Sequence, residues 1–259
     1  MIARNDFRKN RPLLGVALVT ALAAGSGVAC SVGEGVGGAE GTLNVPDCWA
    51  GNFTLEPDFF AGVPFRNSVE LRIQEGGDYT TYSDGLDILV RNLDAILPSA
   101  SSPGLLGRPL PVRIPSNVTP PGVPLEADPS PALIDIALYL QRTCKTQNVA
   151  LYAGTVAVGS DGSCELTPAP PPICRATATS TAPPVRTAES QITFQHLFNG
   201  IPEEPDATKR LTEATFDLYF AEPREICPGG LGPPPRCRGH LKGSFRFTFE
   251  RGRPAQRFP

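Results

Sequence analysis

Cysteine is the residue type whose number and spacing say most about the chemistry of this chain. Seven cysteines are present, and no two of them form a Cys-x-x-Cys pair. Because only two histidines accompany them, the ligand spacings of structural zinc sites are missing, and we expect no bound metal. Six cysteines suit three disulfide bonds in an oxidising compartment; they are Cys48, Cys144, Cys164, Cys174, Cys227 and Cys237.

Six cysteines allow fifteen connectivities, and the sequence does not choose among them. Loop entropy assigns about 3 kcal/mol to a bridge between close neighbours and about 5 kcal/mol to one that spans a long gap. The simplest arrangement joins neighbours and leaves one long bridge: Cys164–Cys174, Cys227–Cys237 and Cys48–Cys144.

Carboxylates are the second candidates for catalysis. The acid and the nucleophile of a glycosidase need a defined separation, which sequence spacing does not supply. The acidic stretches do not follow the pattern of a Ca²⁺-binding loop either. We interpret them as exposed loop charge; they hold Asp78, Asp84 and Asp87, and Glu203, Glu204 and Asp206.

The two histidines lack evident catalytic partners. His196 shares one strand face with Phe194 and Phe198, which predicts a histidine in the core, whereas His240 shares its face with Lys242 and is expected in solvent. No Gly-x-Ser-x-Gly, His-Glu-x-x-His or glycine-rich phosphate loop occurs. We therefore expect no catalytic, cofactor-binding or metal-binding residue, no cofactor, and a protein that is not an enzyme.

The C-terminus is basic. Residues 236–259 hold seven basic residues and one acid, Glu250. A stripe of arginines there could meet lipid headgroups or another anionic partner; its members are Arg246, Arg251, Arg253 and Arg257. The interpretation weighed against it is a solvated strand face followed by a frayed tail.

The N-terminus predicts export. Four basic residues within positions 1–12 precede an apolar run from Leu13 to Ala24 and small residues up to Cys30. This pattern is typical of a secretory signal peptide over residues 1–29. The apolar run is shorter than the roughly twenty residues that span a bilayer.

The segment Gly27-Val28-Ala29-Cys30 resembles the lipobox of bacterial lipoproteins, in which the cysteine is diacylated and becomes the mature N-terminus. The family usually has Leu where this chain has Gly27, and Gly27-Val28-Ala29 also resembles an ordinary signal peptidase site. The resemblance implies lipidation of Cys30, which would account for the odd cysteine. Ser31, rather than Asp, follows Cys30, which implies the outer membrane, on its periplasmic or its surface face. In its general organisation, the mature chain resembles uncharacterised Gram-negative envelope lipoproteins.

Residues 30–46 carry the expected lipid and then a run rich in glycine without an apolar period, which predicts a flexible tether of about 20–25 Å. Residues 47–259 are expected to form a single disulfide-braced domain. Without residues 1–29 the formal net charge changes from −3 to −6. This balance favours solubility and gives no reason to expect nucleic acid as a partner.

Alternation of apolar and polar residues dominates the mature chain and predicts half-buried antiparallel strands. Leu86–Arg91 is predicted as a strand that leads into a short helical turn. Proline-rich connections at 98–131 and 168–184 are expected to be long loops. We predict a mainly β fold, an antiparallel sandwich or barrel of about ten strands. The expected strands are 48–55, 69–74, 86–91, 110–114, 134–141, 149–157, 163–167, 189–198, 214–220 and 241–250.

These features predict an exported, lipid-anchored envelope protein that acts as a binding or structural module. Its expected partners are the membrane, through the lipid, and an envelope protein or glycan. One alternative is a β-barrel carrier of a lipid or another apolar ligand, because several strands present one face of Phe, Leu and Ile. The less favoured alternative is a carboxylate-based glycan hydrolase.

Overall fold

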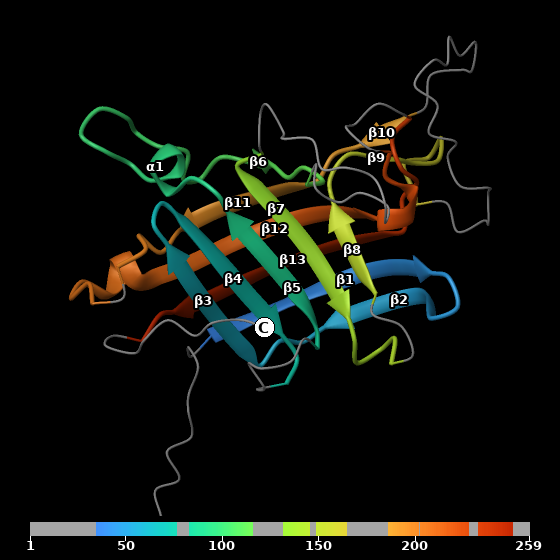
Figure 1. The fold of residues 1–259 in the computed structure, drawn as a ribbon, viewed down its shortest axis with the longest axis horizontal. Coiled ribbons are helices and arrows are strands. Elements are labelled where there is room, and N and C mark those ends of the chain that lie inside the picture. Colours follow the sequence, from blue (N-terminus) through green and yellow to red (C-terminus); the bar gives the residue numbers. More distant parts are fainter. Residues whose placement is uncertain are drawn as a thin grey trace, which may run out of the picture. The chain divides into compact units, whose positions relative to one another are not determined.

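The folded part of the chain is built from antiparallel β-strands (Figure 1). The computed structural model describes residues 35–76, 83–115, 132–145, 149–164, 186–201, 203–227 and 233–250. All of the described residues belong to one compact unit.

Thirteen strands, one short α-helix and two 3-10 helices are present in the described ranges. In chain order they are β1 (Gly35–Val45), β2 (Trp49–Leu55), β3 (Phe59–Phe65), β4 (Ser68–Gln74), β5 (Asp84–Val90), α1 (Leu93–Ile96), β6 (Leu110–Pro111), β7 (Ile134–Leu140), β8 (Ala150–Ala153), β9 (Val156–Ala157), β10 (Thr187–Ala188), β11 (Gln191–His196), η1 (Ala207–Arg210), β12 (Leu211–Ala221), η2 (Pro223–Glu225) and β13 (Gly239–Thr248).

Eleven of these strands form one sheet, and β9 pairs with β10 separately. The sheet runs in the order β2-β1-β13-β12-β8-β7-β5-β4-β3, while β11 pairs with β12 and β6 pairs with β11. β12 forms the corner of the sheet. Its residues Glu213 to Asp217 pair with β11, whereas Phe220 and Ala221 pair with β8.

At this corner the sheet folds back on itself into two layers. The first layer holds β2, β1, β13, β12 and β11, and the second holds β8, β7, β5, β4 and β3, which cross the first layer in Figure 1. β3 and β13 are far apart in the strand order, yet the ring centroids of Phe60 and Phe247 lie 5.5 Å apart. The predicted class, a mainly β antiparallel sandwich or barrel, is confirmed.

The apolar face of each layer points into a shared core. On β7 the alternating residues Ile134, Ile136 and Leu138 are almost completely buried, as the sequence period predicts. Phenylalanine rings fill the middle of the space between the layers. Those that are at most 2% exposed include Phe60, Phe194, Phe198, Phe220 and Phe247.

The prediction of a flexible tether is wrong from residue 35 onward, because Gly35–Val45 forms β1 between β2 and β13; residues 30–34 lie outside the described part of the chain. The glycines are needed for close packing. A Cβ at Gly35 would lie 2.7 Å from the ring of Phe60, and one at Gly37 would lie 2.9 Å from the carbonyl oxygen of Ser244. Small residues on β1 therefore face large rings, a complementarity that composition alone does not reveal. The folded unit begins at least twelve residues before the predicted boundary at 47.

The disulfides confirm one predicted pair and show that the other two predicted pairs are wrong. Cys48 and Cys144 are bonded, with Cα atoms 5.4 Å apart. Cys164 bonds to Cys237, with Cα atoms 4.9 Å apart, so the neighbour pairing is wrong. The parallel bridge between Ala157 and Arg236 places the segments of Cys164 and Cys237 side by side, although 73 positions separate the two cysteines in the sequence. Cys227 is also disulfide-bonded, and Cys174 lies outside the described residues.

Two local predictions have opposite outcomes. The strand and helical turn expected near Leu86–Arg91 are β5 and α1, and the side chain of Asn92 caps the helix by accepting a hydrogen bond from the N–H of Ala95. The strand expected at 163–167 is wrong at Ser163 and Cys164, which belong to no strand. The remainder of that segment lies outside the described ranges.

Candidate functional site

The outer face of the second layer carries a buried polar cluster. On β4 the apolar residues point into the core, and the alternate residues Glu70, Arg72 and Gln74 point away from it. Side chains on such a face are usually solvated, yet Arg72 and Gln74 are each only 1% exposed. Burial of charged and amide groups is costly unless they are well satisfied, which makes this cluster the first candidate for a functional site.

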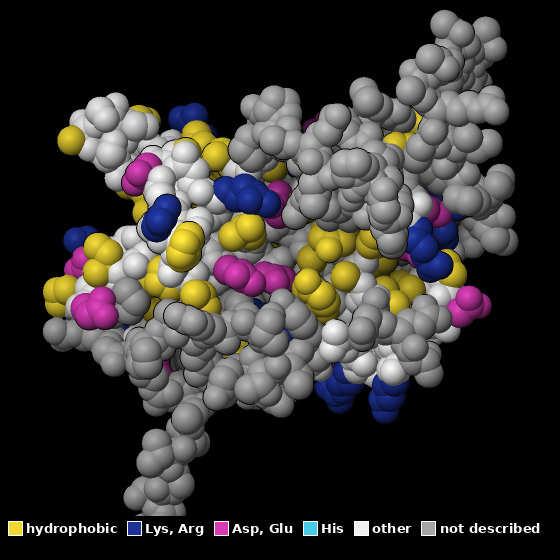
Figure 2. Space-filling model, viewed as in Figure 1, with side chains coloured by type: hydrophobic (Ala, Val, Ile, Leu, Met, Phe, Trp, Pro, Cys, Tyr) yellow, Lys and Arg dark blue, Asp and Glu magenta, His cyan; other side chains and the backbone are white. Residues whose placement is uncertain are grey.

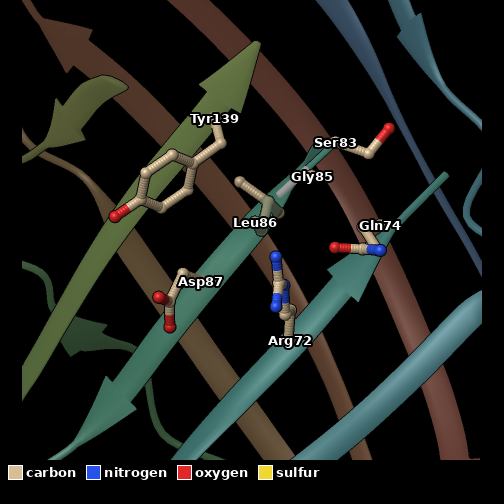
Figure 3. A pocket seen from close by; sticks show the side chains of 7 residues that line it. All are labelled: Arg72, Gln74, Ser83, Gly85, Leu86, Asp87 and Tyr139. Carbon is tan, nitrogen blue, oxygen red and sulfur yellow. The ribbon is translucent and has the colours of Figure 1, made fainter. Parts of the chain in front are cut away.

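Strand register assembles the cluster from three strands. Arg72 on β4 lies directly opposite Asp87 on β5, and Gly85 on β5 lies opposite Tyr139 on β7. A Cβ at Gly85 would come within 2.5 Å of the Cβ of Gln74, so only glycine permits the strands to approach this closely here. Figure 3 shows these side chains on one side of the strands, around the space above Gly85.

The hollow that they line is shallow and partly open to solvent, and it is too narrow to enclose a water molecule. It is therefore not a ligand pocket of the usual size, roughly 300–1,000 Å³, and a ligand would contact only its rim. Acidic side chains lie near the middle of this face of the molecule, between hydrophobic ones (Figure 2).

Asp87 is the electrostatic centre of the cluster. Burial, together with the charge of Glu70 and a hydrogen bond between the two carboxyl groups, raises the pKa of Asp87 from 3.8 to about 8, against the opposing effect of Arg72. Near neutral pH Asp87 therefore keeps its proton and can donate it in the hydrogen bond to Glu70. Burial and the neighbouring Asp87 also raise the pKa of Tyr152 on β8 above 10.0.

This arrangement offers donors and acceptors for a polar ligand. The proton of Asp87 is used in the hydrogen bond to Glu70, so the carboxyl oxygens are acceptors for a ligand, while the guanidinium and the amide supply further polar groups. The two carboxyls are in hydrogen-bond contact, whereas glycosidase pairs lie about 5–5.5 Å or about 6.5–9.5 Å apart. Glu70 and Asp87 therefore suit recognition better than glycoside hydrolysis.

The raised pKa of Asp87 predicts a pH-dependent stability. Because Asp87 binds its proton more tightly in the folded state, it stabilises the fold fully below the unfolded pKa of 3.8, and this stability is lost as the pH rises towards about 8. Asp87→Asn should resemble the wild type near pH 4 and become progressively more stable than the wild type as the pH approaches 8. Urea unfolding at several pH values measures the difference. Glu70→Gln should move the wild-type pH dependence to lower pH, and a constant offset between Asp87→Asn and wild type would contradict the assignment.

Two of the other predicted carboxylates, Asp84 and Asp206, have local structural roles, and the prediction of exposed loop charge is wrong for Asp84, which is buried at the start of β5. Asp84 accepts hydrogen bonds from the backbone N–H groups of Arg142 and Thr143, at 2.8 and 3.0 Å, beyond the end of β7. Asp206 caps η1 through Thr208, and these hydrogen bonds lower the pKa of Asp206. Asp78 lies outside the described residues. Of the predicted acidic stretches only Asp87 belongs to the cluster, and its partners Glu70 and Arg72 were not predicted. The only sign of them in the sequence was their place among the polar residues that alternate along 69–74.

The core position predicted for His196 is wrong, because the residue is exposed. A register shift between Phe194 and His196 interrupts the alternation, so that Leu197 and Phe198 return to the core one position out of phase. His240 does lie on the outer face with Lys242, as predicted. It also stacks on Tyr219, with ring centroids 4.0 Å apart, and its Nε2 lies 2.6 Å from Asp217.

The basic stripe is only partly described. Arg246 is exposed on β13 and its Nε lies 3.5 Å from the carboxylate of Glu213. Arg251, Arg253 and Arg257 lie outside the described residues. Two other basic residues of this region, Arg236 and Arg238, turn inward and form ion pairs with the buried Glu225. The stripe therefore stays a prediction.

Comparisons give no assignment for this arrangement: no protein-family model, curated protein or solved structure matches the chain. Within the described ranges, no set of three or more His, Cys, Asp and Glu side chains is placed to hold a metal ion. The helices described in the structure include none with the length and hydrophobicity needed to cross a membrane.

Proposed function

We propose that this chain is an exported, lipid-anchored envelope protein whose folded unit binds a polar ligand, with a glycan as the favoured class. The observation that carries the proposal is the buried cluster of Glu70, Arg72 and Asp87 beside Tyr139. These residues lie on the face of the second layer that does not contribute to the core. Carboxyl oxygens and a phenol, beside a buried guanidinium, match the mixed donors and acceptors of sugar hydroxyls.

The state of the cysteines supports export. All five cysteines in the described part of the chain are disulfide-bonded, as expected in an oxidising compartment. Six cysteines beyond Cys30 suffice for three bridges, so Cys30 is available for the lipid that its lipobox-like context implies. An outer-membrane position remains part of this proposal.

The packed interior weighs against the carrier alternative. A carrier would need space between the layers, but buried phenylalanine rings occupy that region, and Phe198 and Phe249 stack with centroids 3.9 Å apart. A surface site therefore explains binding better than a lumen.

The experiment is a calorimetric titration of the full chain with two probes, solubilised peptidoglycan fragments and the core oligosaccharide of lipopolysaccharide. Asp87→Ala removes the carboxyl group and Tyr139→Phe removes the phenol, and each should raise the Kd of the bound probe about tenfold, equivalent to about 1.4 kcal/mol. The same substitutions on the other layer, Asp217→Ala and Tyr219→Phe, are matched controls and should leave the Kd unchanged. Lack of binding to both probes, or equal loss in the control variants, would refute the proposal.

A further inference from the structure

Exposed apolar side chains gather at one end of the folded unit. Four large hydrophobic residues in the described ranges are exposed: Val36 at 70%, Phe65 at 67%, Ile201 at 51% and Trp49 at 38%. Val36 is the second residue of β1, Phe65 is the last residue of β3, and Ile201 precedes η1. Trp49 lies instead beside Val45, at the far end of β1.

Contacts join the first three positions into one end of the unit. Gly35 pairs with Phe247 near the end of β13, and the N–H of Phe249 donates to the carbonyl of Arg210 at 3.0 Å. The Cα of Gly200, next to Ile201, packs near Pro64, since a Cβ there would lie 3.9 Å from the Cβ of Pro64. The start of β1, the end of β13, the connection before β12 and the β3–β4 turn therefore meet, on the left in Figure 1.

Chain length ties this same end to Cys30. Because β1 begins at Gly35, only five residue steps separate it from Cys30, and a fully extended chain covers at most about 18 Å in that number. The headgroup region of each leaflet is about 5–7 Å thick. A lipid on Cys30 would therefore hold the start of β1 within about 18 Å of the anchor, whereas the predicted tether would place residue 46 about 20–25 Å away.

The β3–β4 turn has the chemistry of an interfacial contact. The guanidinium carbon of Arg66 lies 5.4 Å from the centre of the Phe65 ring. An aromatic ring beside a basic group suits the boundary between acyl chains and phosphates, because the ring enters the apolar region while the charge stays at the headgroups.

We propose that this end of the unit, defined by Val36, Phe65, Arg66 and Ile201, rests on the lipid surface that holds the anchor. The inference depends on the lipidation of Cys30 proposed above. It orients the protein. β1 stands away from the membrane, and the eleven residues of this strand place its far end about 33 Å further out.

The single tryptophan of the chain makes the orientation measurable. The full chain would be produced in a bacterium that lipidates proteins, checked by mass spectrometry of its N-terminal peptide, and reconstituted into phosphatidylethanolamine–phosphatidylglycerol vesicles whose acyl chains carry bromine. Bromine quenches tryptophan emission at short range. The samples are wild type, with Trp49, and two variants in the Trp49→Phe background, Phe65→Trp and Ile201→Trp.

Interfacial side chains enter about 5–10 Å below the headgroup surface, so both variants should lose about half of their emission while wild type keeps nearly all of it. Lipid on Cys30 with unquenched residues 65 and 201, or with a quenched Trp49, would overturn the orientation and leave the anchor intact. A Cys30 without lipid would overturn the anchor and this inference together. All substituted positions are exposed, so the variants are expected to fold.

Discussion

Replacing Cys48 and Cys144 together by alanine is expected to lower the free energy of unfolding by about 4 to 5 kcal/mol. The bond closes a loop with a sequence separation of 96, and the unfolded chain gains entropy when that constraint is removed. It also joins the start of β2, in the first layer, to the segment after β7, in the second. Equilibrium urea unfolding of the oxidised proteins measures the loss.

Reduction supplies the control for this prediction. Under conditions that open every disulfide, wild type and the double variant should unfold at nearly the same urea concentration, because neither retains the constraint. A loss below about 1 kcal/mol in the oxidised proteins would show that this bridge contributes little to the stability of the fold.

Replacing Gly41 by alanine is expected to cost about 3 kcal/mol of stability, at the upper end of typical overpacking effects. A Cβ at this position would overlap the carbonyl oxygen of His240 and lie 3.1 Å from the Cα of Leu241. Both are backbone atoms of β13, which cannot rotate away as a side chain would. The strands would have to separate along a pairing that holds the centre of the first layer.

Gly38→Ala is the matched control on the same strand. A Cβ there would lie 3.5 Å from the carbonyl oxygen of Leu55, an ordinary contact, so its unfolding free energy should stay within about 1 kcal/mol of wild type. Thermal or urea unfolding measures the stability of the two variants. A large loss only in Gly41→Ala would show that residues 35–45 form a packed strand and not a tether. Equal stability of Gly41→Ala and Gly38→Ala would contradict the placement of β1.

The orientation proposed for the membrane gives the polar cluster a place relative to it. The ligand hollow above Gly85 lies on the outer face of the second layer, and the proposed lipid contact lies at the end of the unit that contains the β3–β4 turn. Binding of a glycan and contact with lipid would then use different surfaces, and the calorimetric titration and the quenching measurement test them independently.

The alternation along Ile134–Leu140 and Leu211–Ala221 determined by itself that these segments are strands with one apolar face. This period depends only on neighbouring residues, which is why the mainly β class and the strand followed by a helical turn before Pro98 could be predicted. Cys48–Cys144 was one of the predicted bridges, but its selection among the alternatives depended on contacts that sequence spacing does not contain.

Only the tertiary structure shows where the alternation of apolar and polar residues fails and which strands pair with each other. The glycine-rich composition of residues 35–45 predicted a tether, but in the structure these glycines pack closely against large rings and the backbone of β13. His196 lies on the exposed face, and not on the predicted core face, because of a register shift. Cys164 bonds to Cys237 because the fold brings their distant segments side by side. Arg72 and Asp87 belong to strands whose pairing puts them opposite each other. The alternation of side chains is a local property of the chain. The close packing of strands, their register and the pKa of a buried carboxyl depend on residues that are far apart in the sequence.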